Sequence, residues 1–346
     1  MSYSLQIINP VESPIWDDMV LASECYSVFH SSAWMRVLHE AYRYRPYVFL
    51  VFDGRHPMVM LPVMEVGSFL TGRRGVSLPF SDYCDPVLSS NGANPEAVNA
   101  ILTYAAKAKW KSLEFRGGSS LFPETEASSS YSGHVLLLNG DTDALFKAFR
   151  DSTRRNIKKA EKSGIHVEVD DSMEFLEKFY GLHCITRKHH GLPPQPFDFF
   201  RKLHFHVIAQ NQGRIFLAFH DGKAVAGDIC LHFGSRATYK YGASDRRLQH
   251  LRPSNLLMWE IIRYYALRGF ESLDLGRTTT DNTGLMQFKN GWGCKQYPIS
   301  YYRYDVAKRS FLHSKATGIG RMNTVLKHAP IPLLRGLGSM LYRHMA

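Results

Sequence analysis

An internal repeat limits the fold of this chain more than any other feature of its sequence. Residues 49–63 (FLVFDGRHPMVMLPV) and residues 216–229 (FLAFHDGKAVAGDI) each read as a strand, an Asp-Gly turn and a second strand, the pattern of a β-hairpin. Residues 100–117 and residues 260–277 each read as a helix followed by a short turn and a strand. The two matched pairs occur in the same order, about 160 residues apart. This spacing predicts two similar α/β units rather than an array of short repeats.

The repeat also sets the predicted domain boundaries. We expect a first unit at residues 1–140, a second unit at 141–306 and a basic, partly apolar tail at 307–346, with the Ser-rich stretch 127–133 marking the junction. In the second unit the expected elements are helices at 152–164, 172–190 and 255–268, a hairpin at 214–234, and strands at 237–244 and 270–275. This order is typical of a mixed, mostly antiparallel sheet flanked by helices, an α/β (α+β) architecture.

Composition excludes several classes of protein. The chain has 346 residues, of which 45% are hydrophobic, and no run approaches the roughly 18 apolar residues of a membrane span. The N-terminal residues lack the basic start and apolar stretch of a secretory signal. Five cysteines occur without a C-x-x-C pair, which favours reduced thiols over a disulfide framework or a zinc site. We therefore expect a cytoplasmic protein without a bound metal.

Positive charge is concentrated in the tail. The formal net charge is +11, no Asp or Glu follows Asp305, and the 7 Lys and Arg residues beyond it leave +4 for the rest of the chain. Basic residues mixed with apolar ones fit a segment that lies on anionic lipid at the inner face of a membrane. The alternative is a C-terminal helix docked on the body, since Pro330 and Pro332 prevent one long amphipathic helix. Nucleic acid is a third interpretation of the same charge.

Four segments of the second unit carry a family resemblance: RRNIKKAEKSGI (154–165), HGLPPQPFDFF (190–200), YKYGASD to RPSNLLMWEII (239–262) and DLGRT to GLMQFKNGWG (274–293). With this order of elements, the chain resembles the N-acyltransferases of the GNAT superfamily and, within it, the Fem-type (FemAB-like) peptidyl or aminoacyl transferases. The resemblance implies two GNAT-like units in tandem, of which the second is catalytic. It also implies an activated donor as co-substrate, aminoacyl-tRNA or acyl-CoA, and no bound cofactor.

The turn before the expected helix at 255–268 bears on the donor. GNAT enzymes bind the pyrophosphate of coenzyme A there, through backbone amides of a glycine-rich turn at a helix N-terminus. Here the turn contains no glycine between Arg247 and Asn255, and Pro253 has no amide donor. The sequence therefore disfavours coenzyme A, while Arg252 and Asn255 at the helix start are retained as candidate anion contacts. The larger Fem ligases contain a long charged helical hairpin in this unit, and this chain departs from them by lacking such a segment.

Lys289 is the first candidate catalytic residue. It follows Phe288 and precedes a Gly-Trp-Gly turn that contains Trp292, in a stretch expected to be a Thr- and Asn-rich loop. An amine beside aromatics can hold a phosphate, a carboxylate or developing negative charge. The resemblance implies that Lys289 contacts the phosphate or ester oxygen of the donor, with Phe288 and Trp292 beside the substrate. From the residues alone, an exposed loop lysine next to packing aromatics is the alternative.

Asp228 and two tyrosines form the second group of candidates. Asp228 occupies a strand position that usually prefers an apolar residue, so its carboxylate is predicted either to orient or deprotonate an acceptor amine or to face outward from the sheet. Tyr239 and Tyr241 alternate along one strand, which predicts that both face the same side. One of them is predicted to orient the donor or acceptor through its hydroxyl, and aromatic packing is the alternative.

Three arginines complete the predicted substrate-binding set. Arg154 begins a basic run along one helix, Arg187 lies near a helix end, and Arg277 follows a strand directly before the Gly/Thr loop. Guanidinium groups suit a phosphate-rich substrate such as a lipid-linked pyrophosphate or the acceptor end of tRNA. A solvated helix face is the alternative interpretation for Arg154, and a helix C-terminus with favourable cations is the alternative for Arg187.

The predicted function is transfer of an acyl or aminoacyl group from an activated donor to an amine of a cell-envelope or exopolysaccharide precursor. The acceptor would attack the donor directly, without a covalent enzyme intermediate. A coenzyme A-dependent N-acyltransferase is the alternative enzyme. A non-catalytic module that binds a polysaccharide or a lipid-linked assembly is the alternative of a different class. The expected partners are the precursor, tRNA as donor, and a membrane surface contacted through the tail.

Overall fold

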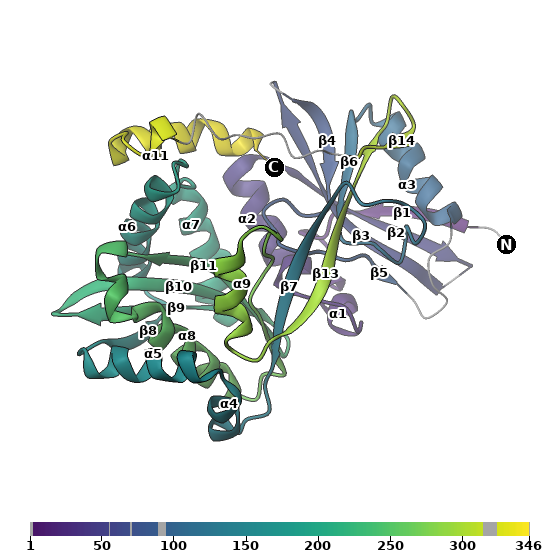
Figure 1. Ribbon diagram of the computed structural model, residues 1–346. Helices are drawn as coiled ribbons and strands as arrows, with labels where there is room; N and C mark the ends of the chain where they lie inside the picture. Colours follow the sequence, from purple (N-terminus) through teal and green to yellow (C-terminus); the bar gives the residue numbers. More distant parts are fainter. Residues whose placement is uncertain (1–2, 55, 70, 89–94, 314–323, 346) are drawn as a thin grey trace. The chain divides into compact units, whose positions relative to one another are not determined.

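The computed structural model describes residues 3–54, 56–69, 71–88, 95–313 and 324–345, and these form two compact units (Figure 1). Unit 1 takes its residues from Met1–Tyr131, Pro298–Ala316 and Tyr342–Ala346, and unit 2 takes its residues from Ser132–Tyr297 and Thr317–Leu341. The units thus differ from the predicted ranges 1–140 and 141–306, and the tail is divided between them. Strand pairing explains the difference, because segments that are distant in the chain complete each sheet.

The sheet of unit 1 has the order β1-β2-β3-β4-β6-β13. These strands are β1 (Tyr3–Ile8), β2 (Arg45–Asp53), β3 (His56–Ser68), β4 (Gly72–Val76), β6 (Ser112–Arg116) and β13 (Lys295–Asp305), with the short β5 (Val87–Leu88) beside β3 and β14 (Ser310–Phe311) beside β13. Only β4 and β6 are parallel among these described pairs. The helices of unit 1 are α1 (Trp16–Leu21), η1 (Val28–His30), α2 (Ser32–Tyr42), α3 (Pro95–Lys107) and η4 (Tyr342–His344).

The sheet of unit 2 has the order β7-β12-β11-β10-β9-β8. These strands are β7 (Ser129–Leu137), β12 (Ser272–Asp274), β11 (Arg236–Ser244), β10 (Lys223–Phe233), β9 (Gly213–His220) and β8 (His166–Asp170). The pair β11 and β12 is parallel, and the other described pairs are antiparallel. The sheet is therefore mixed and mostly antiparallel, as predicted.

Helices cover both faces of the unit 2 sheet (Figure 1). Its helices are α4 (Thr142–Ala148), α5 (Asp151–Lys162), α6 (Met173–His189), α7 (Phe197–Leu203), the π-helix η2 (His204–Gln212), η3 (Arg246–Leu251), α8 (Pro253–Ala266), α9 (Thr283–Asn290) and α11 (Ile331–Leu341). The helices α5 and α8 lie on one face, and α6 and α7 lie on the other. The core beneath α8 buries residues such as Leu257, Ile261 and Tyr265, each with no exposed surface.

The predicted repeat is confirmed at the level of topology. The hairpins β2–β3 and β9–β10 correspond, and α3–β6 corresponds to α8–β12. In each unit a third strand, β4 or β11, pairs antiparallel with the hairpin and parallel with the strand that follows the helix. The Asp-Gly turns at Gly54 and Gly222 both adopt positive φ, which glycine tolerates without strain.

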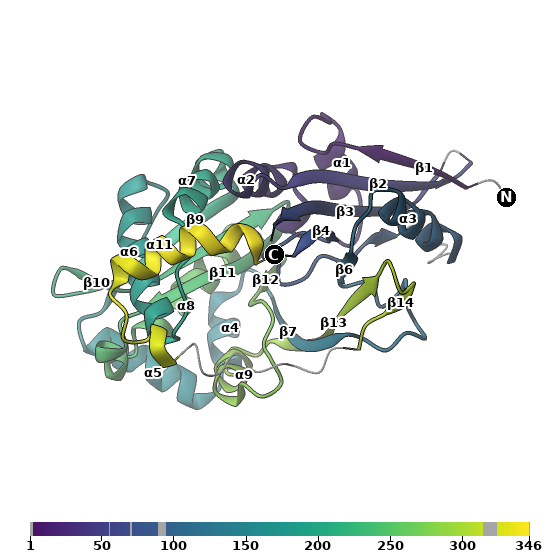
Figure 2. The same cartoon turned by 90° about the horizontal axis from the view of Figure 1, so that it is seen from above.

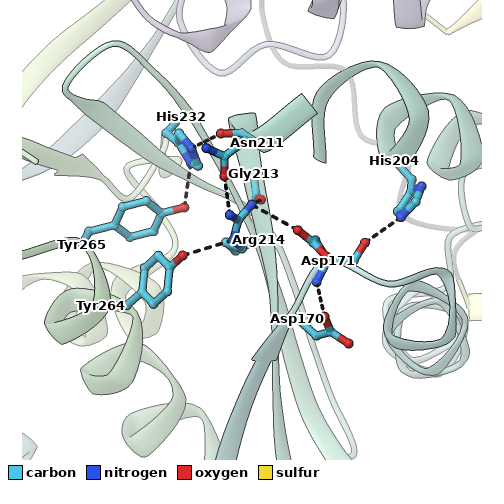
Figure 3. Close-up of polar contacts among 9 residues, drawn as sticks. All are labelled: Asp170, Asp171, His204, Asn211, Gly213, Arg214, His232, Tyr264 and Tyr265. Atoms are coloured by element: carbon cyan, nitrogen blue, oxygen red, sulfur yellow. Dashed lines mark hydrogen bonds and ion pairs between the residues drawn. The ribbon is translucent and has the colours of Figure 1, made fainter. Parts of the chain in front are cut away.

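A polar network fixes the end of unit 2 around β8, β9 and η2 (Figure 3). Arg214 Nε donates to the Tyr264 hydroxyl at 3.1 Å, and an Arg214 Nη1 lies 3.6 Å from an Asp171 carboxylate oxygen. His232 bridges the Asn211 carbonyl at 2.7 Å and the Tyr265 hydroxyl at 3.2 Å. These bonds join η2, two neighbouring strands and the C-terminal half of α8. They supply a rigid base for the rest of α8.

The described part of the tail packs on the body. Leu334 of α11 is buried, and the guanidinium of Arg335 lies over the ring of Tyr180 on α6, 5.4 Å from its centroid. After α11 the chain enters unit 1, where Tyr342 and His344 are buried. The docked-helix interpretation thus holds for residues 331–344, while residues 314–323 lie outside the described part of the chain. Within the described residues, no helix combines the length and apolar character needed to cross a membrane.

Candidate functional site

The candidate site is a pocket of about 920 Å³ in unit 2, next to the parallel strands β11 and β12. These strands pair only from Arg236 to Thr238, opposite Ser272 to Asp274, although β11 continues to Ser244. The remaining part of β11 therefore has no partner in β12. The pocket wall includes this part of β11, with β10, η3 and the ends of α6, α8 and α9. The pocket thus lies along the part of β11 that has no partner in β12.

Asp228 and Tyr239 contribute a hydrogen-bonded acid pair to this wall. Asp228 is only 5% exposed, and its strand partner is Gly242, whose lack of a side chain lets the Tyr239 hydroxyl occupy the space beside it. A Cβ atom on Gly242 would overlap the Tyr239 hydroxyl and lie 3.0 Å from an Asp228 carboxylate oxygen. Burial raises the pKa of Asp228 well above its usual value, and the hydrogen bond from Tyr239 offsets part of this rise. Asp228 is buried and lines the pocket rather than facing outward from the sheet, and its predicted role toward an acceptor amine stays a prediction.

Tyr241 lies on the opposite face of β11, contrary to the predicted alternation. A register shift between Ile229 and Cys230 places Tyr239 opposite Cys230 and Tyr241 opposite Ile229, so Lys240 is an extra, bulged residue. One extra residue reverses the face to which the following side chain points. Tyr241 consequently packs against aromatic rings on α6 and α7, namely His183, Phe199 and Phe200. It is not among the residues that line the pocket.

The rim of the pocket is positively charged. Lys188, His189 and His190 at the end of α6 face Arg246 and Arg247 of η3. Arg246 contacts the His189 ring directly, and Arg247 pairs with Asp245, Nη2 to Oδ2, at 2.6 Å. Burial lowers the pKa of His190, and the neighbouring cations lower it further. The rim therefore favours an anion, because binding one would offset the mutual repulsion of these groups.

Backbone amides of the turn between β11 and α8 are occupied by the turn itself. The Arg247 amide donates to the Asp245 side chain at 3.0 Å, and the Leu248 amide donates to the Asp245 carbonyl at 3.1 Å. The amides of Arg252 and Asn255 donate to the carbonyls of Gln249 and Arg252, each at 3.0 Å. A pyrophosphate needs several amides that point toward it. This turn offers charged side chains instead.

Lys289 lies on a helix, where the sequence predicted a loop, and its ammonium group is buried. Its Nζ donates to the carbonyls of Gly276 at 2.8 Å and Arg277 at 3.1 Å, and the residue is 3% exposed. Asn282 caps the helix by accepting from the Leu285 amide at 3.2 Å. Lys289 is not among the pocket-lining residues, whereas its neighbour Phe288 is. The geometry shows a tether for the segment after β12, and the predicted contact with a donor stays a prediction.

Most of the predicted binding residues lie outside the pocket wall. The structure brings together Asp228, Tyr239 and Phe288. Arg154 instead donates to the Lys147 carbonyl at 3.2 Å, and Arg187 donates to the Pro193 carbonyl at 3.3 Å. The remaining predicted residues do not line it either: Arg252 and Asn255 at the start of α8, Arg277 after β12, and Trp292, which is buried against Phe149. Their predicted roles stay predictions.

Sequence reasoning did not select several polar residues of the wall: Thr186, Ser244, Arg246, Gln249, Ser254 and Asn282. Thr186 and Ser244 connect α6 to β11, because the Ser244 amide donates to Thr186 Oγ1 at 3.0 Å and that hydroxyl donates to the Ser244 carbonyl at 3.2 Å. The run of charged residues directly after a strand was a signal for Arg246. No local pattern marked Thr186, which comes from another part of the chain.

Comparisons with known proteins agree with this fold. Residues 147–290 match the family described as acetyltransferase (GNAT) domain. The UDP-N-acetylmuramoylpentapeptide-lysine N(6)-alanyltransferase of Weissella viridescens is 24% identical over 139 residues, which span 38% of this chain and 41% of that protein. The crystal structure of FemX superposes with a TM-score of 0.69 at 15% identity, covering 90% of this chain and 98% of FemX.

A second solved structure supports the tandem arrangement. A tandem GNAT protein from the clavulanic acid biosynthesis pathway superposes with a TM-score of 0.57 at 10% identity, covering 88% of this chain and 99% of that one. At sequence identities this low, the structural similarities show the fold alone. Together with the domain match and the curated relative, they confirm the predicted resemblance: residues 147–290 match a GNAT domain, and the chain is similar to a Fem-type transferase and to a protein with two GNAT units in tandem.

Proposed function

We propose that the chain transfers an aminoacyl group from an activated donor to an amine of a peptidoglycan-type envelope precursor. The observation that carries this proposal is the pocket beside β11, which combines a cationic rim with the buried pair Asp228 and Tyr239. The related alanyltransferase is named for transfer to a lysine of a UDP-linked muramoyl pentapeptide. Such an acceptor has a primary amine as nucleophile. In this proposal the chain works in the cytoplasm, where aminoacyl-tRNA is available.

The rim supports a donor other than coenzyme A. In the turn before α8, the amides of Arg247, Leu248 and Arg252 already donate to Asp245 and Gln249. The cations Lys188, Arg246 and Arg247 remain as contacts for phosphate. Side-chain contacts of this kind suit the phosphodiester of a nucleic acid 3′ end, to which an amino acid is esterified in aminoacyl-tRNA. We therefore assign the donor as aminoacyl-tRNA.

Asp228 supplies the proton chemistry in this proposal. A lysine-type amine is protonated at neutral pH and must lose a proton before it attacks the donor ester. The raised pKa of Asp228 makes its carboxylate a stronger base than an exposed aspartate, and Tyr239 orients it. The amine nitrogen then bonds to the ester carbonyl carbon, the carbon–oxygen bond to the ribose breaks, and the released hydroxyl takes up a proton. No covalent enzyme intermediate is needed.

A donor comparison tests the proposal. Purified protein would be incubated with UDP-muramoyl pentapeptide and with alanyl-tRNA, acetyl-CoA or no donor, and the acceptor would be analysed by mass spectrometry. We expect an added alanyl residue with alanyl-tRNA alone. An added acetyl group would establish the coenzyme A alternative. Binding of the pentapeptide without consumption of either donor would support the non-catalytic binding module.

A further inference from the structure

The C-terminal segment of the chain takes part in the pocket. Ile331, the first residue of α11, is one of the residues that line the cavity. Lys327 lies a few residues earlier, and its positive charge acts on the histidine pair at the rim. After burial and the other neighbouring cations, Lys327 lowers the pKa of both His189 and His190. The segment that carries the chain's excess basic charge thus reaches the cationic rim.

Close contacts hold α11 in this position. Gly338 lies so near the loop before α7 that a Cβ atom there would overlap the Pro194 carbonyl oxygen. Leu334 is 1% exposed, and Arg335 stacks over Tyr180, whose hydroxyl donates to the Gln195 carbonyl at 3.0 Å. Both views show α11 running along α6 (Figures 1 and 2). This is a docked helix whose close approach at Gly338 leaves no space for a side chain.

We propose that residues 327–338 form a wall of the donor pocket, in which Lys327 completes a phosphate-binding cluster and Ile331 limits the space beside it. The inference concerns the same pocket as the proposed function, and it adds the tail as a determinant of donor binding. The ligand chemistry is a phosphate ester or phosphodiester, because Lys188, Arg246 and two histidines line this rim and the positive charge of Lys327 acts on both histidines. When α11 is docked, the positive charge of Lys327 lies at the pocket rim, and release of α11 moves this charge away.

A pair of glycine variants in one helix tests the docking requirement. Gly338→Ala introduces a methyl group into the Pro194 carbonyl, whereas Gly336→Ala places the same group in open space. Both changes raise helix propensity by the same amount, so they differ only in the contact. Binding of two probes, inorganic pyrophosphate and the trinucleotide CCA, would be measured by calorimetry on the full chain. We expect about tenfold weaker binding for Gly338→Ala and wild-type affinity for Gly336→Ala.

Cysteine labelling reports whether α11 has moved. Cys184 of α6 is 3% exposed, burial raises the pKa of its thiol, and it interacts with Tyr180, the ring over which Arg335 lies. Release of α11 should therefore speed the reaction of Cys184 with a thiol reagent, followed by peptide mass spectrometry because Cys25 is exposed. Faster labelling in Gly338→Ala, with a preserved unfolding transition, shows a folded protein whose tail is undocked. If labelling stays slow, Leu334→Asp serves as the stronger undocking variant.

A charge variant tests the chemistry. Lys327→Gln should weaken binding of both probes about fivefold and reduce the dependence of affinity on salt, because one cation fewer faces the phosphate. Lys223→Gln is the matched control, since Lys223 is exposed at the start of β10 and outside the pocket lining. Stronger loss for CCA than for pyrophosphate would indicate a nucleic acid end, and equal loss would indicate a phosphate group alone.

The outcomes separate this inference from the proposed function. Undocked or charge-neutralised variants that bind both probes like the wild type would overturn the inference, as would a wild-type protein that binds neither probe. If the wild type binds the probes and the variants bind them weakly, but no aminoacyl group is ever transferred, the proposed function fails and the tail's role in phosphate binding stands.

Discussion

The two units use one topology, and the pocket described above lies beside the third strand of unit 2. In unit 1, β4 ends at Val76, where it is still paired with β6. The next residue continues the pairing, because the Ser77 amide donates to the Glu114 carbonyl at 2.8 Å and the Arg116 amide donates to Ser77 Oγ at 2.6 Å. In unit 2, β11 runs six residues beyond its pairing with β12, from Tyr239 to Ser244.

The comparison indicates that, in a duplicated scaffold, a binding pocket forms where the pairing between two neighbouring strands stops. Beyond Thr238, β11 stays paired with β10 but has no partner in β12, and Gly242 lets the Tyr239 hydroxyl approach Asp228. In unit 1 the corresponding position is filled by backbone hydrogen bonds to β6. If this contrast is correct, changes at matched positions of the two units should have different effects on transfer.

The largest effect is expected for Asp228→Asn. Loss of the base should reduce kcat by about 10²–10³-fold, the usual contribution of general acid–base catalysis. The control is Asp221→Asn, on the exposed turn of the same hairpin, which should retain wild-type kcat. Steady-state transfer to the pentapeptide is the measurement. Activity of Asp228→Asn within threefold of wild type would remove Asp228 from the mechanism.

Tyr239→Phe tests the proposed role of Asp228 as a base through the pH dependence of kcat. The Tyr239 hydrogen bond lowers the pKa of Asp228 relative to burial alone, so its loss should raise that pKa further. A base must be deprotonated, and the acidic limb of kcat against pH should therefore move to higher pH, with about tenfold lower activity at neutral pH. A pH profile identical to wild type would contradict the proposed pairing of these two residues in catalysis.

Two glycines in the third strands provide the direct comparison of the units. A Cβ on Gly75 of β4 would overlap the ring of Trp110, and a Cβ on Gly242 of β11 would overlap the Tyr239 hydroxyl. Each Gly→Ala change should lower the unfolding free energy by roughly 1–3 kcal/mol through overpacking. Only Gly242→Ala should also reduce kcat by about tenfold or more, since it displaces a group at the site. Equal effects of the two changes on kcat would contradict the proposed difference between the units.

Lys289→Met tests whether the buried lysine is a tether. Loss of two hydrogen bonds from an ammonium group should lower the unfolding free energy by roughly 1.5–3 kcal/mol. Lys295→Met, at an exposed position of β13, is the control and should be nearly neutral. Transfer should persist at temperatures where the variant is folded. Complete loss of transfer in the folded variant would instead support the predicted contact between Lys289 and the donor.

The smallest expected effect is on the pH dependence of the unfolding free energy, to which the carboxyl groups of Asp228 and Glu114 contribute in opposite directions. Burial raises the pKa of Asp228, so the native state loses stability as pH rises above the unfolded value of about 3.9. For Glu114 of unit 1, burial acts in the same direction, but Arg116, Arg303 and Arg74 outweigh it and the pKa is lowered. Its contribution is therefore present above about pH 4.3 and lost as pH falls through the native pKa.

Urea unfolding between pH 4 and pH 8 measures this difference. Asp228→Asn should become progressively more stable than wild type as pH rises, because the variant removes a buried charge. Glu114→Gln should be less stable than wild type by a nearly constant amount above about pH 5, and this difference should shrink as pH falls below about 4.3. Parallel stability curves for both variants would show that the two carboxyl groups lie in similar environments, contrary to the contacts described above.

Sequence patterns were sufficient for the elements whose signals are local. The hairpins at Asp-Gly turns, the helix–strand pairs and the GNAT-like family resemblance were predicted and are confirmed. The glycine-free turn before α8 was predicted to disfavour coenzyme A, which stays a prediction; the amides of Arg247, Leu248 and Arg252 there donate to Asp245 and Gln249. These features depend on residues close together in the chain, where periodicity and turn chemistry act directly.

The tertiary structure alone decided which side chains meet. A single extra residue at Lys240 separates Tyr239 from Tyr241, and the buried ammonium of Lys289 bonds to carbonyls rather than facing the pocket. The tail, recognisable from its charge, contributes Ile331 to a cavity formed more than 40 residues earlier in the chain. Strand register and close approach depend on contacts between distant segments, and no local pattern contains them. The sequence by itself therefore determined the duplicated scaffold, and packing between its distant parts decided where the pocket lies.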